Sequence, residues 1–485
     1  MSHDALAEFI EEKAKELGIP GAAVGVLVDG RELTVYHGVT SIDNPLPVDR
    51  DTLFVLGSVT KTYTATAVMR LVEQGRVELE APVRRYVPEL RLPDEGAAAQ
   101  ITILNLLNHT AGLDTRMVFD SGDGDDALAR EVTNMAEVAL IGPVGGRASY
   151  SQLGYNLLGR VVENVTGETY EAAVASLVLE QAGMTDSVFT AGQAITRRFA
   201  VGHNLSEGAL KVARTWKDTR GNNPGGGLVS SVSDQLRWAR FHLGGGDLAR
   251  RMQEPTVELH GSTLGDAIGL GWFLRDVDGV RTVGHGGSTN GQFANLLLVP
   301  ERDFAVVAAS NAGPDNGLEF NQAVLRWTLE HYLGVVERDP EPLPYDPQRA
   351  HEITGHYANE FMTLIIDTDG DTMTVECRIK PEIRAAADRE LPRTCRQPPR
   401  PATRLRRRVH RHRWRPDRPA RFPHPRRRRR HHRGRHGRTV LQPGPDTRRV
   451  TPGNPRRAPQ ARPVTASPRS TTFDNYSGQC PHQHR

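Results

Sequence analysis

The chain of 485 residues carries a net charge of +3, but this small value conceals two parts of opposite charge. Residues 391–485 contain 27 Arg, no Lys, three Asp and no Glu, which leaves 34 Lys and Arg against 55 Asp and Glu in residues 1–390. All three cysteines, Cys377, Cys395 and Cys480, lie late in the chain. This excludes a disulfide framework or a cysteine-rich zinc site in the acidic body.

The N-terminal stretch MSHDALAEFIEEKAKELGIP has the pattern of a polar amphipathic helix. It lacks the apolar region and the small-residue cleavage site of a secretory signal. No apolar run in the chain approaches the roughly 18 residues that a membrane-spanning helix needs. We therefore expect a cytoplasmic protein that makes no membrane contact.

The first part of the chain predicts a strand pair followed by a helix. Two β-branched runs flank Asp29-Gly30 within residues 22–38, which indicates a β-hairpin. A helix should follow Ser58 and stop at Gly75. Its buried stripe would be formed by residues spaced for one helix face, namely Ala65, Val68, Met69 and Val72.

Helix-like segments and loops dominate residues 101–245, and strand patterns return in residues 268–310. Within the latter, a hairpin is predicted around residues 300–303. Strands at both ends with helices between them predict an α+β fold. We expect an antiparallel sheet formed by N- and C-terminal segments, with an inserted helical subdomain.

These patterns divide the chain into three predicted parts. A main domain covers residues 1–338, and residues 339–390 hold a linker and the start of a β domain. The linker is indicated by the Pro-rich stretch RDPEPLPYDPQ, and the following β pattern stops abruptly near residue 390. Residues 391–485 form a disordered tail rich in Arg and Pro.

The tail contains 16 prolines and scarcely any Ile, Leu or Phe, which prevents a packed core. Arg, Pro, His, Gly and Ala without Lys or Glu are what a GC-rich gene yields when it is read out of frame. We therefore interpret the tail as a shifted reading frame. A solvated tail without a specific role and an arm that binds nucleic acid through its phosphates are the alternatives.

The stretch GSVTKTYTA places Ser58 and Lys61 three residues apart at the start of the predicted helix. On a helix this spacing puts both side chains on one face, so the lysine ammonium reaches the serine hydroxyl. The helix N-terminus also favours developing negative charge at the serine. A plain N-cap serine and a solvated surface lysine would give the same pattern.

Two further stretches contain candidate polar residues. Tyr150 lies in a loop that leads into an apolar-periodic helix, and a neighbouring Lys61 ammonium would favour its phenolate form. His285-Gly286-Gly287 is expected at the end of a strand, where the glycines let a substrate approach the backbone. Taken singly, a packed tyrosine and a structural histidine explain these residues as well.

In this order and context, the three stretches resemble the serine β-lactamase and penicillin-binding-protein family, in its class C-like branch of serine hydrolases. The family motif S-x-x-K matches Ser58 to Lys61, Y-x-N falls on Tyr150 to Gln152, and H-x-G falls on His285 to Gly287. The stretches LNLLNHTAGL and PGGGLVSSVSDQLRWARF also look like this family. The resemblance covers roughly residues 5–335, and the β pattern near residue 353 resembles the lipocalin-like domain of some members.

The resemblance implies that Ser58 attacks a carbonyl to form an acyl-enzyme, with Lys61 and Tyr150 sharing the proton transfers. Either of these two residues could be the general base. The backbone N–H groups of Ser58 and Ser288 would hold the oxyanion, and His285 would position the substrate or the tyrosine. No metal or cofactor is implied.

One position departs from the family pattern, because Gln152 stands where the family usually has Asn. The longer side chain puts the contact with a substrate amide in doubt, while Gly286 and Gly287 keep the backbone accessible. This puts a preference for β-lactams or peptides in doubt, and the histidine motif points to the esterase or aminopeptidase side of the family. The expected substrate is a small-molecule ester, amide or peptide. His109 is interpreted as structural.

Two alternative functions remain open. The same acyl-enzyme would serve an acyltransferase or peptide cyclase, and an inactive hydrolase domain with a basic tail would bind nucleic acid. The acyl pocket is expected to be shaped by residues 114–147 and 203–224, which are the least patterned stretches of the body.

Overall fold

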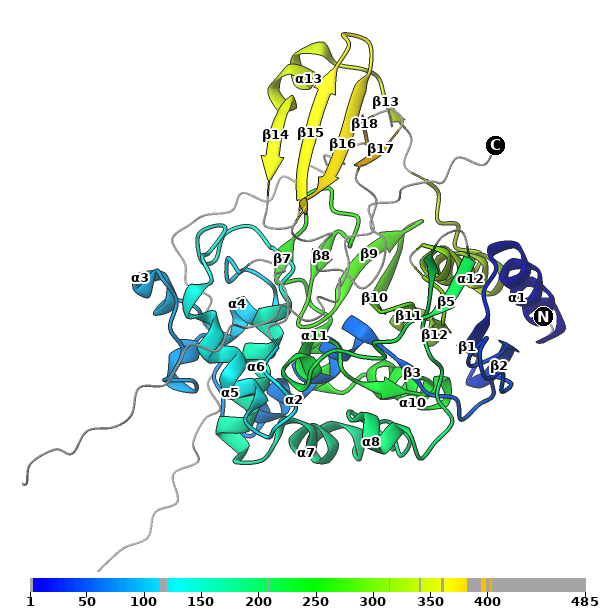
Figure 1. The fold of residues 1–485 in the computed structure, drawn as a ribbon, viewed down its shortest axis with the longest axis horizontal. Helices are drawn as coiled ribbons and strands as arrows, with labels where there is room; N and C mark the ends of the chain where they lie inside the picture. The colour runs from blue at the N-terminus through cyan, green and yellow to red at the C-terminus, as the bar shows by residue number, and fades with distance from the viewer. Residues whose placement is uncertain are drawn as a thin grey trace, which may run out of the picture. The chain divides into compact units, whose positions relative to one another are not determined.

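The computed structural model describes residues 3–113, 120–206, 209–313, 315–339, 342–358, 362–381, 394–397 and 402–403. Within these residues, an eight-stranded antiparallel sheet has the order β2-β1-β12-β11-β10-β9-β8-β7 (Figure 1). Its strands are β1 (Gly21–Val28), β2 (Arg31–Gly38), β7 (Val257–Glu258), β8 (Ala267–Ile268), β9 (Phe273–Val277), β10 (Val280–Thr289), β11 (Gln292–Val299) and β12 (Phe304–Ser310).

The predicted antiparallel sheet is confirmed, and within it a strand from the N-terminal segment pairs with a strand near residue 310. Strands β1 and β2 form the expected hairpin, in which Asp29 and Gly30 both have positive φ, as a tight two-residue turn requires. Strand β1 then pairs with β12, so that Ala22 lies opposite Ser310. Strands β11 and β12 form the second hairpin, and Asp303 in its turn also has positive φ.

Helices cover both faces of the sheet. Helices α1 (His3–Leu17) and α12 (Asn316–Leu333) pack on one face, and α2 (Thr60–Glu73) and α10 (Val232–Leu243) pack on the other. Alternate residues of β12 point to opposite sides: Phe304, Val306 and Ala308 join the first core, and Ala305, Val307 and Ala309 join the second. This alternation explains why β12 is buried along its whole length.

The helical subdomain lies between β2 and β7 in the sequence. Its further helices are α3 (Glu95–Ala98), α4 (Ile103–Leu107), α5 (Ala127–Asn134), α6 (Gln152–Thr166), α7 (Tyr170–Val174), α8 (Ala191–Ala194), α9 (Asn223–Gly226) and α11 (Asp247–Met252). Two short strand pairs accompany them, β3 (Phe54–Val55) with β6 (Val229–Ser230), and β4 (His203–Ser206) with β5 (Ala209–Val212).

The prediction of a single buried stripe on the helix after Ser58 was too narrow. Every residue of α2 from Thr60 to Met69 is buried, whereas Val72 is partly exposed. Threonines make this possible, because Thr62 and Thr66 donate their hydroxyl groups to backbone carbonyls within the same segment. Polar residues of α2 are therefore accommodated inside the core, and α2 is a central helix.

The C-terminal described residues differ from the prediction at two places. The expected linker contains α13 (Pro347–Ile353) and β13 (Pro342–Leu343), which pairs with β18 (Ala402–Thr403). A four-stranded sheet follows, of β14 (Gly355–Ala358), β15 (Met362–Thr368), β16 (Met373–Ile379) and β17 (Thr394–Gln397). Strands β17 and β18 therefore extend secondary structure beyond residue 390, although the rest of the predicted tail lies outside the described residues.

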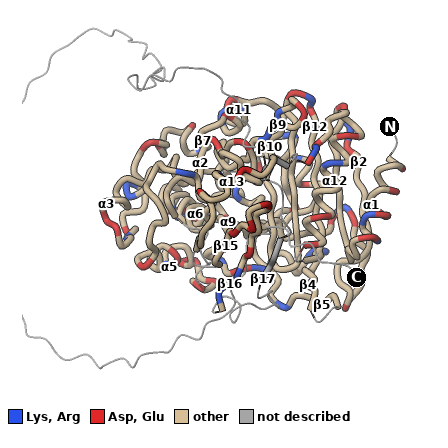
Figure 2. The backbone as a smooth tube through the Cα atoms, turned by 90° about the horizontal axis from the view of Figure 1, so that it is seen from above, with Lys and Arg blue, Asp and Glu red and all other residues tan. Residues whose placement is uncertain are grey.

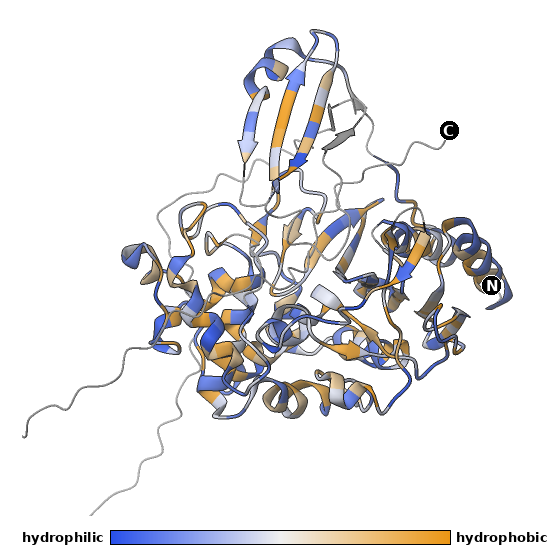
Figure 3. Cartoon of the chain, viewed as in Figure 1, coloured by the Kyte–Doolittle hydropathy of each residue, from blue (hydrophilic) through white to orange (hydrophobic). Residues whose placement is uncertain are grey.

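The distribution of charge and hydropathy agrees with a water-exposed body around apolar cores. Acidic and basic residues are interspersed over the elements (Figure 2), and apolar residues concentrate in the packed helices and along β15 (Figure 3). Within the described ranges, every helix is too short or too polar to span a bilayer.

Candidate active site

Ser58 lies in a tight turn between a strand and the central helix. Strand β3 ends at Val55, a 3-10 helix covers Gly57–Val59, and α2 begins at Thr60. Gly57 has a φ of 52°, a left-handed conformation that glycine adopts without strain. Ser58 is completely buried, and the N-caps of these two helices are Leu56 and Val59. Ser58 is therefore not the plain N-cap that the sequence left as an alternative.

Lys61 is also completely buried, which excludes a solvated surface lysine. Its Nζ atom lies 3.0 Å from Ser58 Oγ and 2.7 Å from the carbonyl oxygen of Gly225, and it donates a third hydrogen bond to Gln152 Oε1. Three acceptors match the three N–H bonds of an ammonium group. The predicted contact between Ser58 and Lys61 is thus present in the structure.

The three contacts of Lys61 also suit its neutral amine. The carbonyl oxygens of Gly225 and Gln152 only accept, so each takes one of the two N–H bonds of the amine. The lone pair of the nitrogen then points toward Ser58 Oγ, which becomes the donor. Lys61 can therefore exchange a proton with Ser58 without any change in the positions of these heavy atoms.

Tyr150 lies beside this pair, just before α6. The Lys61 ammonium is 4.8 Å from the centre of its ring, and only 9% of Tyr150 is exposed. His109 supports the loop: its ring centre is 4.6 Å from that of Tyr150, and its Nδ1 accepts from the backbone N–H of Ser151. His109 also has positive φ and accepts at its carbonyl from the N–H of Ser149. The structural role expected for His109 is thus to hold the tyrosine loop.

His285 is in the middle of a strand, and the prediction of a strand end was wrong. Strand β10 continues to Thr289, and His285 pairs with Leu296 of β11. Its Nδ1–H donates to the Gly286 carbonyl at 2.6 Å, which leaves Nε2 as an acceptor. Burial, aided by the nearby Lys61 charge, lowers the pKa of His285 to about 3. His285 is therefore neutral at physiological pH.

Two glycines let β10 touch the serine turn. A Cβ atom on Gly287 would lie 2.0 Å from the Leu56 carbonyl oxygen and 2.7 Å from the Ser58 nitrogen. A Cβ atom on Gly57 would lie 2.7 Å from the Ser288 nitrogen. The backbones at Ser58 and Ser288 are therefore adjacent, as a shared pair of N–H donors requires. Gly286, by contrast, is partly exposed.

Sequence reasoning named Gln152 but missed the residues that it contacts beneath Lys61. Gln152, 3% exposed, accepts from Lys61 and donates from Nε2 to Asn222 Oδ1. A Cβ atom on Gly225 would lie 1.9 Å from Gln152 Nε2, so a side chain there would displace the Gln152 amide. Asn222 falls in the predicted pocket stretch 203–224 and Gly225 lies just after it, and the sequence GNNPGGG was the available signal. Residues 114–119 of the other predicted stretch lie outside the described residues.

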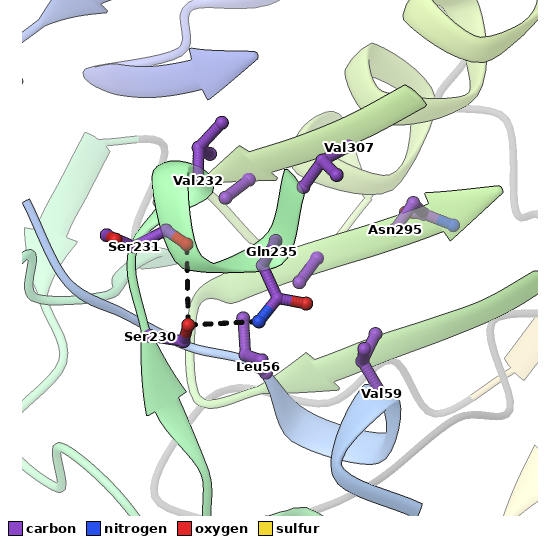
Figure 4. A pocket seen from close by; sticks show the side chains of 10 residues that line it. Leu56, Val59, Ser230, Ser231, Val232, Gln235, Asn295 and Val307 are labelled. Atoms are coloured by element: carbon purple, nitrogen blue, oxygen red, sulfur yellow. Dashed lines mark hydrogen bonds between the residues drawn. The ribbon is translucent and has the colours of Figure 1, made fainter. Parts of the chain in front are cut away.

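A small cavity backs the serine turn (Figure 4). Gln235 crosses it, and its Nε2 donates to Ser230 Oγ at 2.9 Å and to the Tyr63 hydroxyl at 2.7 Å. The cavity is lined by Leu56, Val59, Ser230, Ser231, Val232, Gln235, Ala294, Asn295, Val307 and Ala309. Among the described residues, no group of three or more His, Cys, Asp or Glu is placed to hold a metal ion.

A family model described as Beta-lactamase matches residues 6–328. This chain belongs to the beta-lactamase family. It is 33% identical over 361 residues to penicillin-binding protein 4 of Amycolatopsis lactamdurans, a match that takes in 71% of this chain and 94% of that protein. The expected resemblance to β-lactamases and penicillin-binding proteins is therefore confirmed, and the family is one of serine hydrolases.

Solved structures of the family share the fold. A structure of SurE with D-Leu aligns with a TM-score of 0.62 and 27% identity, covering 78% of this chain and 87% of that one. The octameric penicillin-binding protein homologue from Pyrococcus abyssi aligns with a TM-score of 0.61 and 24% identity, covering 82% and 90%. The second likeness shows the fold alone.

Proposed function

We propose that this protein is a serine hydrolase that forms an acyl-enzyme on Ser58 and hydrolyses a small ester or amide. The observation that carries the proposal is the 3.0 Å contact between Ser58 Oγ and Lys61 Nζ. The Lys61 nitrogen also donates to two carbonyl oxygens, those of the Gln152 side chain and the Gly225 backbone. A nucleophile within hydrogen-bond reach of an oriented base is the arrangement that covalent catalysis requires.

In the first step, neutral Lys61 takes the Ser58 proton as Oγ attacks the substrate carbonyl. The backbone N–H groups of Ser58 and Ser288 stabilise the oxyanion that forms. The leaving group departs with a proton supplied by Tyr150, which regains one from the Lys61 ammonium beside its ring. Water then attacks the acyl-enzyme, and the same groups return the proton to Ser58.

His285 acts in this scheme as a neutral group. Its Nδ1–H is committed to the Gly286 carbonyl, so its Nε2 accepts hydrogen bonds from the substrate or from the Tyr150 side. The two ring centres are 6.1 Å apart. Because Gly286 is partly exposed and Ser58 is not, the substrate approaches from the side of β10.

Transfer of the acyl group to an amine is the second candidate function. The observation in its favour is the likeness to SurE, whose structure with D-Leu is known. A D-amino acid or its amide would then replace water as the attacking group, and peptides ending in D-residues belong among the substrates tested.

The proposal is tested with p-nitrophenyl acetate and butyrate, D-amino acid p-nitroanilides, peptides ending in D-residues, nitrocefin and a fluorophosphonate probe. We expect wild type to cleave at least one ester and to be labelled at Ser58. Ser58→Ala should lose both reactions, whereas Ser262→Ala, at an exposed serine, should retain them. Equal ester cleavage and equal labelling in wild type and Ser58→Ala would refute the proposed hydrolase activity.

The tail is tested separately. A chain lacking residues 391–485 should keep the esterase activity. If instead the full chain shows salt-sensitive DNA binding that this truncation abolishes, and no esterase activity, the binding function is favoured.

A further inference from the structure

A directed chain of hydrogen bonds leads away from Lys61 into the segment before α9. Lys61 donates to Gln152 Oε1, and Gln152 Nε2 donates to Asn222 Oδ1. Asn222 Nδ2 in turn donates to Asp218 Oδ2 at 2.7 Å. Two side-chain amides therefore connect the ammonium group of Lys61 to a carboxylate.

The carboxylate end determines the orientation of both amides. An ionised carboxylate only accepts hydrogen bonds, so Asn222 must present its NH₂ group to Asp218 and its oxygen to Gln152. That oxygen requires the NH₂ group of Gln152, which leaves the Gln152 oxygen facing Lys61. If either amide were reversed, an NH₂ group would face another donor. Hydrogen bonds aligned in this way also strengthen one another.

The surroundings hold this chain in place. Gln152 and Asn222 are 3% and 1% exposed, so water does not compete for their amides. The adjacent Arg220 is fixed by Glu171 at 3.0 Å and by Asp125 at 2.6 Å. Burial raises the pKa of Asp218 above its usual value, and the neighbouring Lys217 and the hydrogen bond from Asn222 reduce this rise without reversing it.

We propose that Asn222 and Asp218 are positioning residues that align the Lys61 amine with Ser58 through Gln152. This inference rests on the proposed acyl-enzyme function. It also gives the unusual glutamine a purpose: its amide spans the distance from Lys61 to Asn222, and its NH₂ group is engaged with Asn222. Gln152 therefore orients Lys61 and is not the residue that recognises a substrate amide.

The test compares two neighbouring asparagines. Asn222 and Asn223 are each 1% exposed and each donates to a carboxylate. Asn223 donates to Glu171 at 2.6 Å and accepts from Lys217 at 2.7 Å, and it is not one of the hydrogen-bonded links between Lys61 and Asp218. The burst of p-nitrophenol from p-nitrophenyl acetate measures acylation. We expect Asn222→Ala to acylate about 100-fold more slowly, because a small misplacement of a reacting group costs that much. Asn223→Ala should stay within threefold of wild type at a similar Tm.

Two further variants separate positioning from a structural effect. Asn222→Ser offers a hydroxyl that both accepts and donates, so it should recover part of the acylation rate with KM unchanged. Asp218→Asn keeps the size but lets both amides reverse, and should slow acylation about tenfold. If Asn222→Ala does not fold, Asp218→Asn decides the question.

The outcomes that overturn the inference are distinct from those that overturn the proposed function. Acylation by Asn222→Ala or Asp218→Asn within threefold of wild type refutes the positioning role while Ser58-dependent activity stands. An equal loss of acylation rate in Asn222→Ala and Asn223→Ala also refutes the positioning role. Wild-type labelling that persists in Ser58→Ala refutes both.

Discussion

At the residue scale, the proposed proton acceptor Lys61 has neutral groups as its hydrogen-bond partners. The partners of Lys61 that its hydrogen bonds identify are a hydroxyl and two carbonyl oxygens, and no carboxylate is among those three. A carboxylate in direct contact would hold the lysine in its charged form. Amide oxygens attract its protons more weakly, which suits the role of a base in the proposed reaction.

Shortening the glutamine tests this arrangement. Gln152→Asn moves the side-chain amide back by one methylene group, so it can no longer reach both Lys61 and Asn222. We expect kcat/KM for an ester substrate to fall about tenfold or more, with little change in Tm. Gln152→Leu, which removes both hydrogen bonds, should lose more. Activity of Gln152→Asn equal to that of wild type would show that the spanning length of the glutamine is not required.

At the scale of elements, the site depends on contact between a strand and a turn. Strand β10 and the 3-10 helix Gly57–Val59 touch through glycines, and the spacing of their backbones places two N–H groups side by side. The sheet fixes one partner and the central helix fixes the other. The expected oxyanion site is thus as rigid as the packing between these two elements.

A methyl group at Gly287 should push strand β10 away from the 3-10 helix that carries Ser58. We expect Gly287→Ala to lower the acylation rate at least 100-fold, because its Cβ would lie 2.0 Å from the Leu56 carbonyl oxygen. Gly284→Ala in the same strand is the control, since its Cβ comes no closer than 3.0 Å to a neighbouring atom. Fluorophosphonate labelling of both variants, normalised to folded protein by circular dichroism, measures the effect. Equal labelling would contradict the contact.

At the scale of the whole molecule, buried neutral histidines tie stability to pH. Burial lowers the pKa of His242 and of His285 to about 3 each, and that of His109 well below its usual range. The unfolded chain takes up protons at these residues below about pH 6.5, whereas the folded protein does so only at much lower pH. The free energy of unfolding should therefore fall as the pH drops from 6.5 toward 3.

His242 isolates one of these contributions. Neither ring nitrogen has a hydrogen-bond partner among the described residues, and the ring packs 4.4 Å from Trp238 and 4.8 Å from Trp272. His242→Phe should reduce the slope of unfolding free energy against pH by about 1.4 kcal/mol per pH unit between pH 5 and 4. Urea unfolding at several pH values measures it. His260→Phe, at an exposed position, is the control, and an unchanged slope in His242→Phe would refute the assignment.

The sequence patterns predicted the strands and the helix after Ser58 because these depend on local periodicity, whereas Tyr150 and His285 were selected through the resemblance to the family. The contact between Ser58 and Lys61 could be predicted from the pitch of a helix alone. Asn222 could not be found this way, because its contact with Gln152, 70 residues away in the sequence, is set by tertiary packing. The position of His285 within β10 was missed for a related reason: glycines suggest a strand end, but here they permit a close contact in its middle.

The pairing of β1 with β12 has a consequence for synthesis. Strand β1 is synthesised long before its neighbour in the sheet, which is made only when residues 304–310 appear. Until then one edge of an apolar hairpin has no partner, and the helical subdomain must form while the sheet is incomplete. Such distant pairing slows folding and exposes strand edges to other chains. A chain interrupted before residue 304 would therefore aggregate, and its serine turn would lack the sheet that holds it.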